Sequence, residues 1–277
     1  MRVRHKSRQR LTLLVGAGRM GGALLRTWIA QGVRSIAAVE PNPGAHLVTL
    51  ARANSIPLFP SIDDVAQEPI AACVIALKPQ VLRTEAVRLK PVARSGALMI
   101  SIAAGTSIAS LVKAWGRMAI VRAMPNTPGA IGKGITALFA PRGVPPKSRV
   151  IAERLMSGLG ETLWVARESA IDTVTAVSGS GPAYVFLLVE SLAEAAREQG
   201  LPAVVADRLA RATVSGAGAL LDADPRPAKA LRTDVTSPHG TTEAALEVLM
   251  KDEALQRLMR NAVAAARRRA EELRREG

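Results

Sequence analysis

The stretch Leu11-Thr-Leu-Leu-Val-Gly-Ala-Gly-Arg-Met-Gly21 decides the fold of the first half of the chain. Five mainly apolar residues run directly into a G-x-G-x-x-G pattern, and the apolar spacing of a helix follows over Met20–Ala30. In a strand–turn–helix unit of this kind, Gly16 permits the tight turn and Gly18 lets the backbone approach a pyrophosphate. Gly21 lets the helix pack closely on the strand. The stretch therefore predicts a dinucleotide site with the phosphates at the helix N-terminus.

Short apolar runs alternate with helical patterns through residues 11–141, which is typical of βαβ units around a parallel sheet. The predicted strands are Leu11–Val15, Ser35–Val39, Cys73–Leu77, Leu98–Ala103, Ala119–Ala123 and Ile135–Phe139. Predicted helices between them include Met20–Ala30, Gly44–Ala53 and Ser107–Trp115. We expect a doubly wound α/β sheet of the Rossmann type over residues 11–166, preceded by a basic tail at residues 1–10.

The second half has a different pattern, because every long segment after a short strand at Thr162–Val165 has helical periodicity. The predicted helices are Tyr184–Glu198, Pro202–Leu221, Glu243–Met250 and Asp252–Arg274. Their apolar faces exceed what one small helical domain can cover. We therefore predict an all-α domain over residues 167–277 that buries this surface against a second copy, in a dimer or a larger assembly.

Composition narrows the class of protein further. Of the 277 residues, 48% are hydrophobic and 22% are charged, which excludes a disordered chain. Charged residues interrupt each apolar run before the roughly 20 residues that a membrane helix needs. One cysteine excludes an internal disulfide, and with three scattered histidines it gives no zinc spacing. We expect a cytoplasmic protein without a metal or a membrane partner.

The formal net charge of +14 first suggests a nucleic-acid partner. The excess lies in residues 1–10 and in the last predicted helix, where arginines alternate with glutamates. None of the seven aromatic residues, three Trp, one Tyr and three Phe, lies near these clusters to stack on bases. This distribution argues against nucleic acid and for a solvated tail and a charged helix face. The tail is acid-free like a transit peptide, but it is short, and we expect no cleaved targeting segment.

Glu40 ends the second predicted strand, 22 residues after Gly18, where a carboxylate can accept both ribose hydroxyls of NAD(H). Its charge repels the 2′-phosphate of NADPH, while Arg19 and Arg52 can turn toward that phosphate. The choice between NADH and NADPH therefore stays open.

Three further loops follow predicted strands, at the sheet edge where ligands bind. Lys78 and Pro79 place a cation and a rigid turn there, although an exposed loop lysine is the alternative interpretation. The small residues of Ser101–Gly105 let a nicotinamide ring lie against the backbone. Arg122–Pro128 is made rigid by two prolines, and turn chemistry alone also explains it.

Two Gly/Ser-rich segments precede helices in the second half, Ser178–Ala183 and Ser237–Thr242. In the first, Pro182 suits the first helical position, with Ser180 or Gly181 as the cap. Backbone N–H groups at such positive helix ends can bind a carboxylate. If the two helix N-termini converge, they form a pocket for a small acid, whereas ordinary capping explains each one alone.

Groups for acid–base chemistry are scarce. The histidines are His5 in the tail, His46 on a predicted helix and His239 beside the second cap, and there is no Ser-His-Asp pattern. Hydride transfer to a protonated C=N bond needs little acid–base chemistry, because the protonated imine is itself the electrophile. The protein then mainly positions two molecules.

Together, the motifs resemble those of pyrroline-5-carboxylate reductases. Arg122–Pro128, Val177–Phe186 and Asp234–Thr242 carry the resemblance, joined to the glycine motif, Lys78-Pro79 and Ser101–Gly105. The resemblance covers almost the whole chain from Leu11. It implies a Rossmann domain and a helical domain that intertwines with a second subunit, often in higher oligomers such as decamers. It also implies hydride transfer from NAD(P)H to C5 of L-1-pyrroline-5-carboxylate, giving L-proline.

The resemblance also implies roles for individual residues. Those that the resemblance places at the cofactor are Gly16, Ala17, Gly18, Arg19, Met20, Gly21, Lys78, Pro79, Ala103 and Ala104, with Met124 and Asn126 near the nicotinamide. Glu40 is expected there from the βαβ pattern. Those that the resemblance places at the substrate are Ser237, Gly240 and Thr241, and the helix-cap pattern adds Ser178 and Ser180. Thr242 is the expected catalytic residue, with its hydroxyl on the imine nitrogen.

Two positions depart from the family pattern. His239 stands where the family usually has glycine, so a positive φ there would strain the backbone and crowd the substrate. Glu40 argues for use of NADH, whereas many members favour NADPH.

Three alternative functions stay open: a reductase of a different cyclic imine, a β-hydroxyacid dehydrogenase-like enzyme and a non-catalytic dinucleotide-binding regulator. Such dehydrogenases use a lysine on the first long helix after their glycine motif, and no lysine lies between Lys147 and Lys229.

Overall fold

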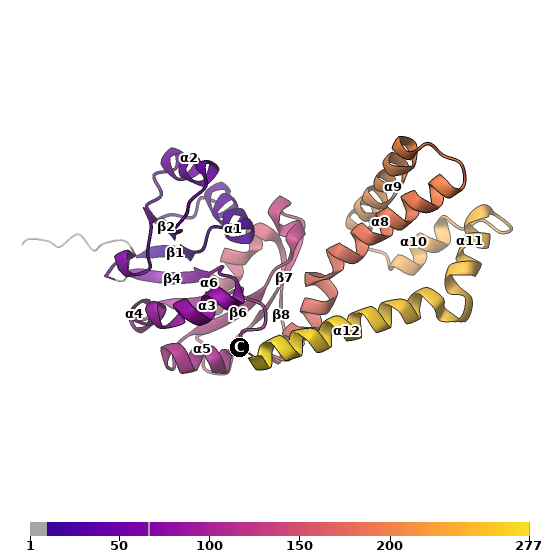
Figure 1. The fold of residues 1–277 in the computed structure, drawn as a ribbon. Coiled ribbons are helices and arrows are strands. Elements are labelled where there is room, and N and C mark those ends of the chain that lie inside the picture. The colour runs from indigo at the N-terminus through magenta and orange to yellow at the C-terminus, as the bar shows by residue number, and fades with distance from the viewer. Residues whose placement is uncertain (1–9, 66, 277) are drawn as a thin grey trace, which may run out of the picture. The chain divides into compact units, whose positions relative to one another are not determined.

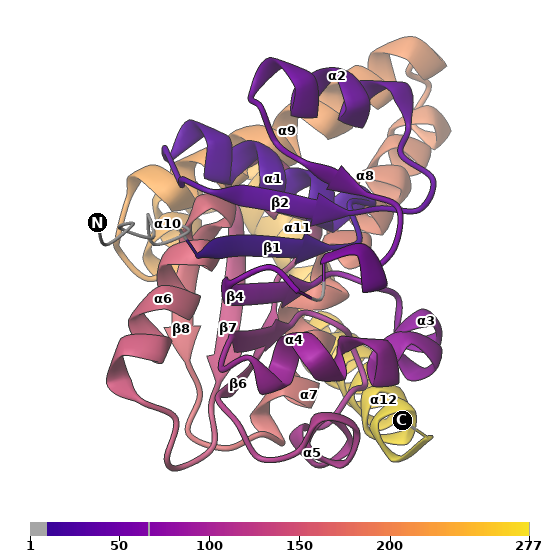
Figure 2. The ribbon, with the colours of Figure 1, turned by 90° about the vertical axis from the view of Figure 1, so that its left-hand side faces the viewer.

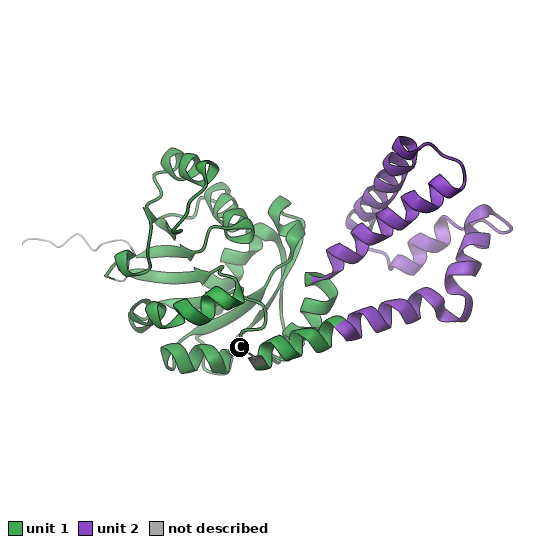
Figure 3. Ribbon diagram, viewed as in Figure 1, with its two compact units in different colours: residues 1–179, 266–277 green, residues 180–265 purple. Residues whose placement is uncertain are grey.

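The computed structural model describes residues 10–65 and 67–276, so the basic tail predicted at residues 1–10 lies outside it except for Arg10. By contacts, the chain divides into two compact units, residues 1–179 with 266–277 and residues 180–265 (Figure 3). The boundary predicted at residues 166 and 167 from the sequence stays a prediction. The last helix contributes residues to both units.

The first unit contains a sheet with the strand order β3-β2-β1-β4-β5-β6-β7-β8 (Figure 1). The strands are β1 (Leu11–Val15), β2 (Ile36–Val39), β3 (Leu58–Phe59), β4 (Ile70–Ile75), β5 (Leu98–Ser101), β6 (Ile120–Met124), β7 (Gly134–Phe139) and β8 (Gly160–Trp164). Neighbouring strands from β3 to β6 are parallel, whereas β7 is antiparallel to β6 and β8 is parallel to β7. The predicted doubly wound α/β sheet is confirmed.

Helices cover both faces of the sheet (Figure 2). One face carries α1 (Arg19–Ala30), α2 (Ala45–Ala53) and α6 (Pro146–Met156), and the other carries α3 (Pro79–Glu85), α4 (Lys90–Arg94) and α5 (Ile108–Trp115). Alternate residues of the central strands enter the two cores, with Leu14 in the first and Leu13 in the second. Trp28 of α1 is fully buried, and its indole donates a 2.7 Å hydrogen bond to the Leu155 carbonyl of α6. The sheet therefore lies between two buried apolar cores.

Helices dominate the chain after β8. The α-helices are α7 (Ala170–Val174), α8 (Gly181–Glu198), α9 (Ala203–Ala223), α10 (Ala228–Asp234), α11 (Thr241–Met250) and α12 (Ala254–Glu276). A π-helical turn, Thr175–Gly179, joins α7 to α8. The shorter 3-10 turns of the chain are Asp63–Val65, Ala86–Leu89, Thr127–Ile131, Ser157–Leu159 and Lys251–Glu253. The predicted helical character of the second half is confirmed.

The helices of the second unit expose a large apolar surface. On α8, the side chains of Val185, Phe186, Leu187, Leu188 and Leu192 are between 40% and 62% exposed. By length and composition, the stretch Ala170–Glu198 also passes as a membrane-spanning helix. From the sequence we expected charges to interrupt every such stretch, but no charged residue lies between Asp172 and Glu190. That test is weak support for a membrane, and a second protein copy explains the same exposed surface.

Candidate active site

The glycine loop between β1 and α1 has the geometry that its pattern requires. Gly16 has a φ of +88°, and a Cβ there would lie 2.9 Å from Leu77 Cδ2 and 3.0 Å from the Ala76 carbonyl oxygen. A Cβ on Gly21 would collide with the carbonyl oxygen of Gly16. Gly18 is the N-cap of α1, and a Cβ there would meet no protein atom within 4 Å. The loop thus packs tightly at Gly16 and Gly21 and is open at Gly18.

The Glu40 carboxylate lies against this loop. Its Oε2 accepts a 2.8 Å hydrogen bond from the backbone N–H of Ala17, and its Oε1 accepts a 3.3 Å bond from that of Asn42. Both bonds come from backbone that the sheet positions, so the carboxylate has a fixed place directly after β2. This is the sheet edge at which a Rossmann-type fold binds the ribose of a dinucleotide.

Two cavities flank Glu40. The first, of about 460 Å³, lies between the glycine loop, the end of β2 and the loop after β4, and Gly16, Gly18 and Lys78 line it. The second, of about 480 Å³, is lined by Arg19, Arg26 and His46 among others. The structure therefore brings the residues predicted from three separate motifs to one edge. Arg26 and His46 were missed as a group, because only the fold places their two helices beside the same cavity.

Lys78 and Pro79 begin α3, with Lys78 as its N-cap and Pro79 in its first turn. On the neighbouring strand end, Ala103 is buried, and its N–H donates to the Ser101 hydroxyl at 3.3 Å. Both segments lie at the carboxyl ends of β4 and β5, as predicted. Their contacts with a cofactor stay predictions.

The loop after β6 links several parts of the first unit. The Asn126 side-chain oxygen accepts a 2.9 Å hydrogen bond from the Ile135 N–H, which fixes the start of β7. The Met124 Cε atom lies 3.0 Å from the position of a Cβ on Gly179, so this residue reaches the π-helical turn before α8. Two motifs that lie far apart in the sequence are therefore neighbours in the fold.

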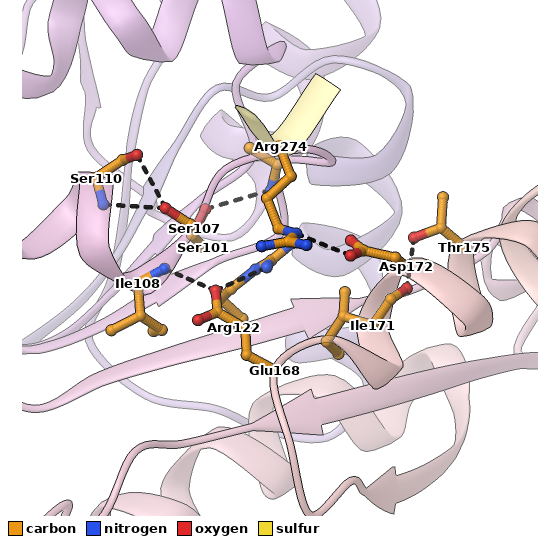
Figure 4. Close-up of polar contacts among 11 residues, drawn as sticks. Ser101, Ser107, Ile108, Ser110, Arg122, Glu168, Ile171, Asp172, Thr175 and Arg274 are labelled. Carbon is orange, nitrogen blue, oxygen red and sulfur yellow. Dashed lines mark hydrogen bonds and ion pairs between the residues drawn. The ribbon is translucent and has the colours of Figure 1, made fainter. Parts of the chain in front are cut away.

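Figure 4 shows polar contacts that join β6, α5, α7 and α12, including those of Arg122 and Glu168. The side chain of Arg122 is 3% exposed, and its Nη1 lies 2.8 Å from Oε1 of Glu168. The same carboxylate oxygen accepts a 2.7 Å bond from the Ile108 N–H at the start of α5. Arg122 is therefore a buried structural cation. The sequence analysis did not predict its pairing with Glu168, because the two lie 46 positions apart.

The N-terminus of α8 differs in detail from the prediction. Ser180 is the N-cap but its side chain caps no backbone group, and Gly181 rather than Pro182 is the first helical residue. Ser178 lies in the π-helical turn, where its hydroxyl donates a 3.1 Å hydrogen bond to the Val174 carbonyl. A π-helical turn is frequent at functional sites, and a sequence pattern gives no direct signal for one.

At α11, Gly240 is the N-cap, so the helix starts at Thr241 and not near Glu243. Ser237 lies directly beneath it, because its carbonyl accepts a 3.1 Å hydrogen bond from the Gly240 N–H. Thr242 is then the second residue of the helix. The predicted convergence of the N-termini of α8 and α11 stays a prediction.

His239 has a φ of +59°, the left-handed conformation that glycine adopts without strain. Its N–H donates a 2.6 Å hydrogen bond to Oε2 of Glu243, and its ring is almost completely exposed. The backbone strain that the sequence analysis made conditional on a positive φ is therefore present. The Glu243 carboxylate holds the strained residue at the start of α11.

Cys73, the one cysteine of the chain, lies inside the sheet. It is fully buried in β4, and burial raises the pKa of its thiol. A thiol that stays protonated is a poor nucleophile. Among the described residues, no group of three or more His, Cys, Asp or Glu side chains could hold a metal ion.

A doubly wound sheet with a glycine loop, an acidic residue after β2 and a helical second part defines an NAD(P)-dependent oxidoreductase of the Rossmann class. Residues 10–105 match the family model described as NADP oxidoreductase, coenzyme F420-dependent. Residues 168–273 match the pyrroline-5-carboxylate reductase dimerisation model. The chain belongs to the pyrroline-5-carboxylate reductase family.

Full-length relatives support this assignment. The chain is 38% identical to the pyrroline-5-carboxylate reductase of Pseudomonas aeruginosa, over 94% of this chain and 95% of that one. Its identity to the Synechocystis enzyme is also 38%, over 94% and 97% of the two chains. The solved Coxiella burnetii enzyme has a TM-score of 0.87 at 33% identity, covering 95% of this chain and 98% of that chain. The Plasmodium falciparum enzyme, solved with NADP bound, has a TM-score of 0.80 at 26% identity, covering 96% and 99%.

Proposed function

We propose that this protein reduces L-1-pyrroline-5-carboxylate to L-proline, the last step of proline biosynthesis. The observation that carries the proposal is full-length similarity to enzymes of this name, in a chain that has the complete glycine loop and the Asp234–Thr242 motif. The test is the loss of absorbance of NADH or NADPH with purified protein and pyrroline-5-carboxylate, with proline identified as the product. The second candidate function is reduction of a different cyclic imine, which the strained His239 favours. Turnover of such an imine in place of pyrroline-5-carboxylate would support it.

The residues at the sheet edge fit a dinucleotide. The open face of Gly18 leaves room for a pyrophosphate at the N-terminus of α1, where Ala17, Arg19 and Met20 complete the loop. The cavity that Gly16, Glu40 and Lys78 line fits the adenosine half. Ala103, Ala104, Met124 and Asn126 are the proposed contacts of the nicotinamide half, with Pro79 and Gly21 supporting the fold around them. When bound, NAD(P)H supplies the hydride that C5 of the imine accepts.

The proposed substrate site uses the start of α11. The Ser237 hydroxyl and the backbone N–H of Thr241 bind the carboxylate beside the N-cap Gly240, because the helix N-terminus carries partial positive charge. The Thr242 hydroxyl hydrogen-bonds to the ring nitrogen and orients the C=N bond. Ser178 and Ser180 contribute further polar contacts. These groups bind and orient, and the protonated imine accepts the hydride at carbon while its nitrogen keeps the proton.

Glu40→Ser is expected to raise the ratio of kcat/KM for NADPH to that for NADH at least about tenfold, because a carboxylate beside a 2′-phosphate is a close like-charge contact. Arg19, Arg26 and His46 line the adjacent cavity and would then face that phosphate without the competing negative charge. Initial rates with both cofactors measure the ratio. Glu161→Ser, which removes an exposed carboxylate on β8, is the control. An unchanged ratio would contradict the placement of Glu40 at the ribose.

The dimerisation domain and the exposed face of α8 support a homodimer. We propose further that the helical domains of two copies intertwine and that the dimers assemble into a decamer in the cytoplasm. Light scattering coupled to gel filtration tests the assembly, because the mass per particle distinguishes two chains of 29.1 kDa from ten.

A further inference from the structure

The C-terminal end of α12 belongs to the first unit and carries a charge into it. Arg274 Nε lies 2.8 Å from Oδ2 of Asp172, the third residue of α7. The Asp172 side chain is 2% exposed and that of Arg274 is 30% exposed (Figure 4). A carboxylate this deeply buried needs a charged partner, because loss of the partner leaves an uncompensated charge in a medium of low dielectric constant. The pair therefore fixes α12 on α7.

Leu273, the residue before Arg274, contacts the Ser101–Gly105 segment. Gly105, at a φ of +65°, lies so close to α12 that a Cβ there would be 3.0 Å from Cβ and 3.2 Å from the carbonyl carbon of Leu273. Gly105 ends the Ser101–Gly105 segment after β5, which contains the proposed nicotinamide contacts Ala103 and Ala104. One turn of α12 thus supports this segment directly.

The same ion pair borders the turn before α8. Asp172 lies three residues before Thr175, the first residue of the π-helical turn Thr175–Gly179. The Thr175 hydroxyl donates a 2.8 Å hydrogen bond to the carbonyl of Ile171, the neighbour of Asp172. Gly179, at the end of that turn, packs on Met124. Arg274 therefore lies between the segment that contains Ala103 and Ala104 and the turn that packs on Met124, which are three of the proposed contacts of the nicotinamide half.

We infer that Arg274 is a positioning residue for the reaction: through Asp172 and the adjoining Leu273, it holds the Ser101–Gly105 segment and the turn before α8 in the arrangement that orients the nicotinamide ring. This inference rests on the proposed function for the place of that ring. The ion pair itself touches neither cofactor nor substrate. Its effect is confined to the nicotinamide half, because the adenosine half is bound at the Glu40 cavity, which neither Arg274 nor Asp172 lines.

Arg274→Ala in the full-length chain tests the inference. We expect kcat/KM for NAD(P)H to fall about tenfold, since small displacements of reacting groups carry penalties of this size or larger. The dissociation constant of ADP-ribose, which has the adenosine half but no nicotinamide, is expected to change less than about twofold because its binding site is intact. Arg274→Lys restores a cation and should recover part of the activity. Arg275→Ala removes the exposed neighbour and should leave both quantities unchanged.

Three results distinguish the explanations. An equal loss of ADP-ribose and NAD(P)H affinity in Arg274→Ala would overturn the inference, because it would indicate general destabilisation. Unchanged kinetics would also overturn it. If Arg274→Ala does not fold, the pair Arg274→Gln and Asp172→Asn replaces it, since removing both charges leaves no buried charge unpaired; its kcat/KM must still fall while ADP-ribose binds normally. If the wild-type protein does not reduce the imine, that result contradicts the proposed function and not the role of Arg274.

Discussion

Thr242→Ala is expected to lower kcat for pyrroline-5-carboxylate reduction about a hundredfold, the usual cost of removing one hydrogen-bonding group that orients and stabilises the reacting centre. Thr242 is the second residue of α11, next to the backbone N–H groups proposed to bind the substrate carboxylate. We propose that a hydroxyl at this position hydrogen-bonds to the ring nitrogen of a substrate whose carboxylate lies at the helix N-terminus. Stopped-flow or steady-state loss of reduced-nicotinamide absorbance measures kcat directly.

The affinity for NAD(P)H is expected to be unchanged in Thr242→Ala, because the glycine loop proposed to bind the phosphates belongs to the other unit of the chain. Thr242→Ser keeps the hydroxyl and should recover most of the turnover. Thr233→Ala is the matched control, since that hydroxyl donates to the Lys229 carbonyl within α10 and has no proposed catalytic role. Full turnover in Thr242→Ala would remove this residue from the mechanism.

Local patterns predicted much of the fold. Strands β1 and β2 and helices α1 and α2 lie within a residue of their predicted limits. The strands are continuous apolar runs and the helices have helical periodicity, and turn residues lie at their ends. The two-residue strand β3 was not predicted, since two residues give no period. Helix α11 starts earlier than predicted because Gly240 caps it, and a glycine cap resembles an ordinary loop residue in sequence.

In the candidate site, contacts between residues close in sequence could be predicted, and contacts between distant residues could not. The glycine loop is a continuous stretch, and Glu40 lies a fixed distance after it, so their proximity follows from the βαβ pattern. The partners Arg122 and Glu168, and Asp172 and Arg274, are 46 and 102 positions apart. Their pairing depends on how the sheet, α7 and α12 pack, and no local pattern contains that information.

Gly18→Ala is expected to weaken NAD(P)H binding by about a hundredfold, because the new methyl group would occupy the space that a pyrophosphate needs at the N-terminus of α1. A Cβ on Gly18 meets no protein atom within 4 Å, and its φ of −65° lies outside the left-handed region that favours glycine. The variant should therefore fold normally and have the melting temperature of the wild-type protein without cofactor. Titration of the reduced-nicotinamide fluorescence measures the dissociation constant.

Gly21→Ala separates a binding effect from a folding effect. There, a Cβ would collide with the Gly16 carbonyl oxygen and approach the Ala76 side chain, so the new methyl group forces α1 away from the sheet. This variant is expected to lose stability as well as affinity, in the way that overpacked cores do. Gly18→Ala should lose affinity alone. If Gly18→Ala binds NAD(P)H as tightly as the wild type while Gly21→Ala is unstable, the glycines serve helix packing only and the pyrophosphate lies elsewhere.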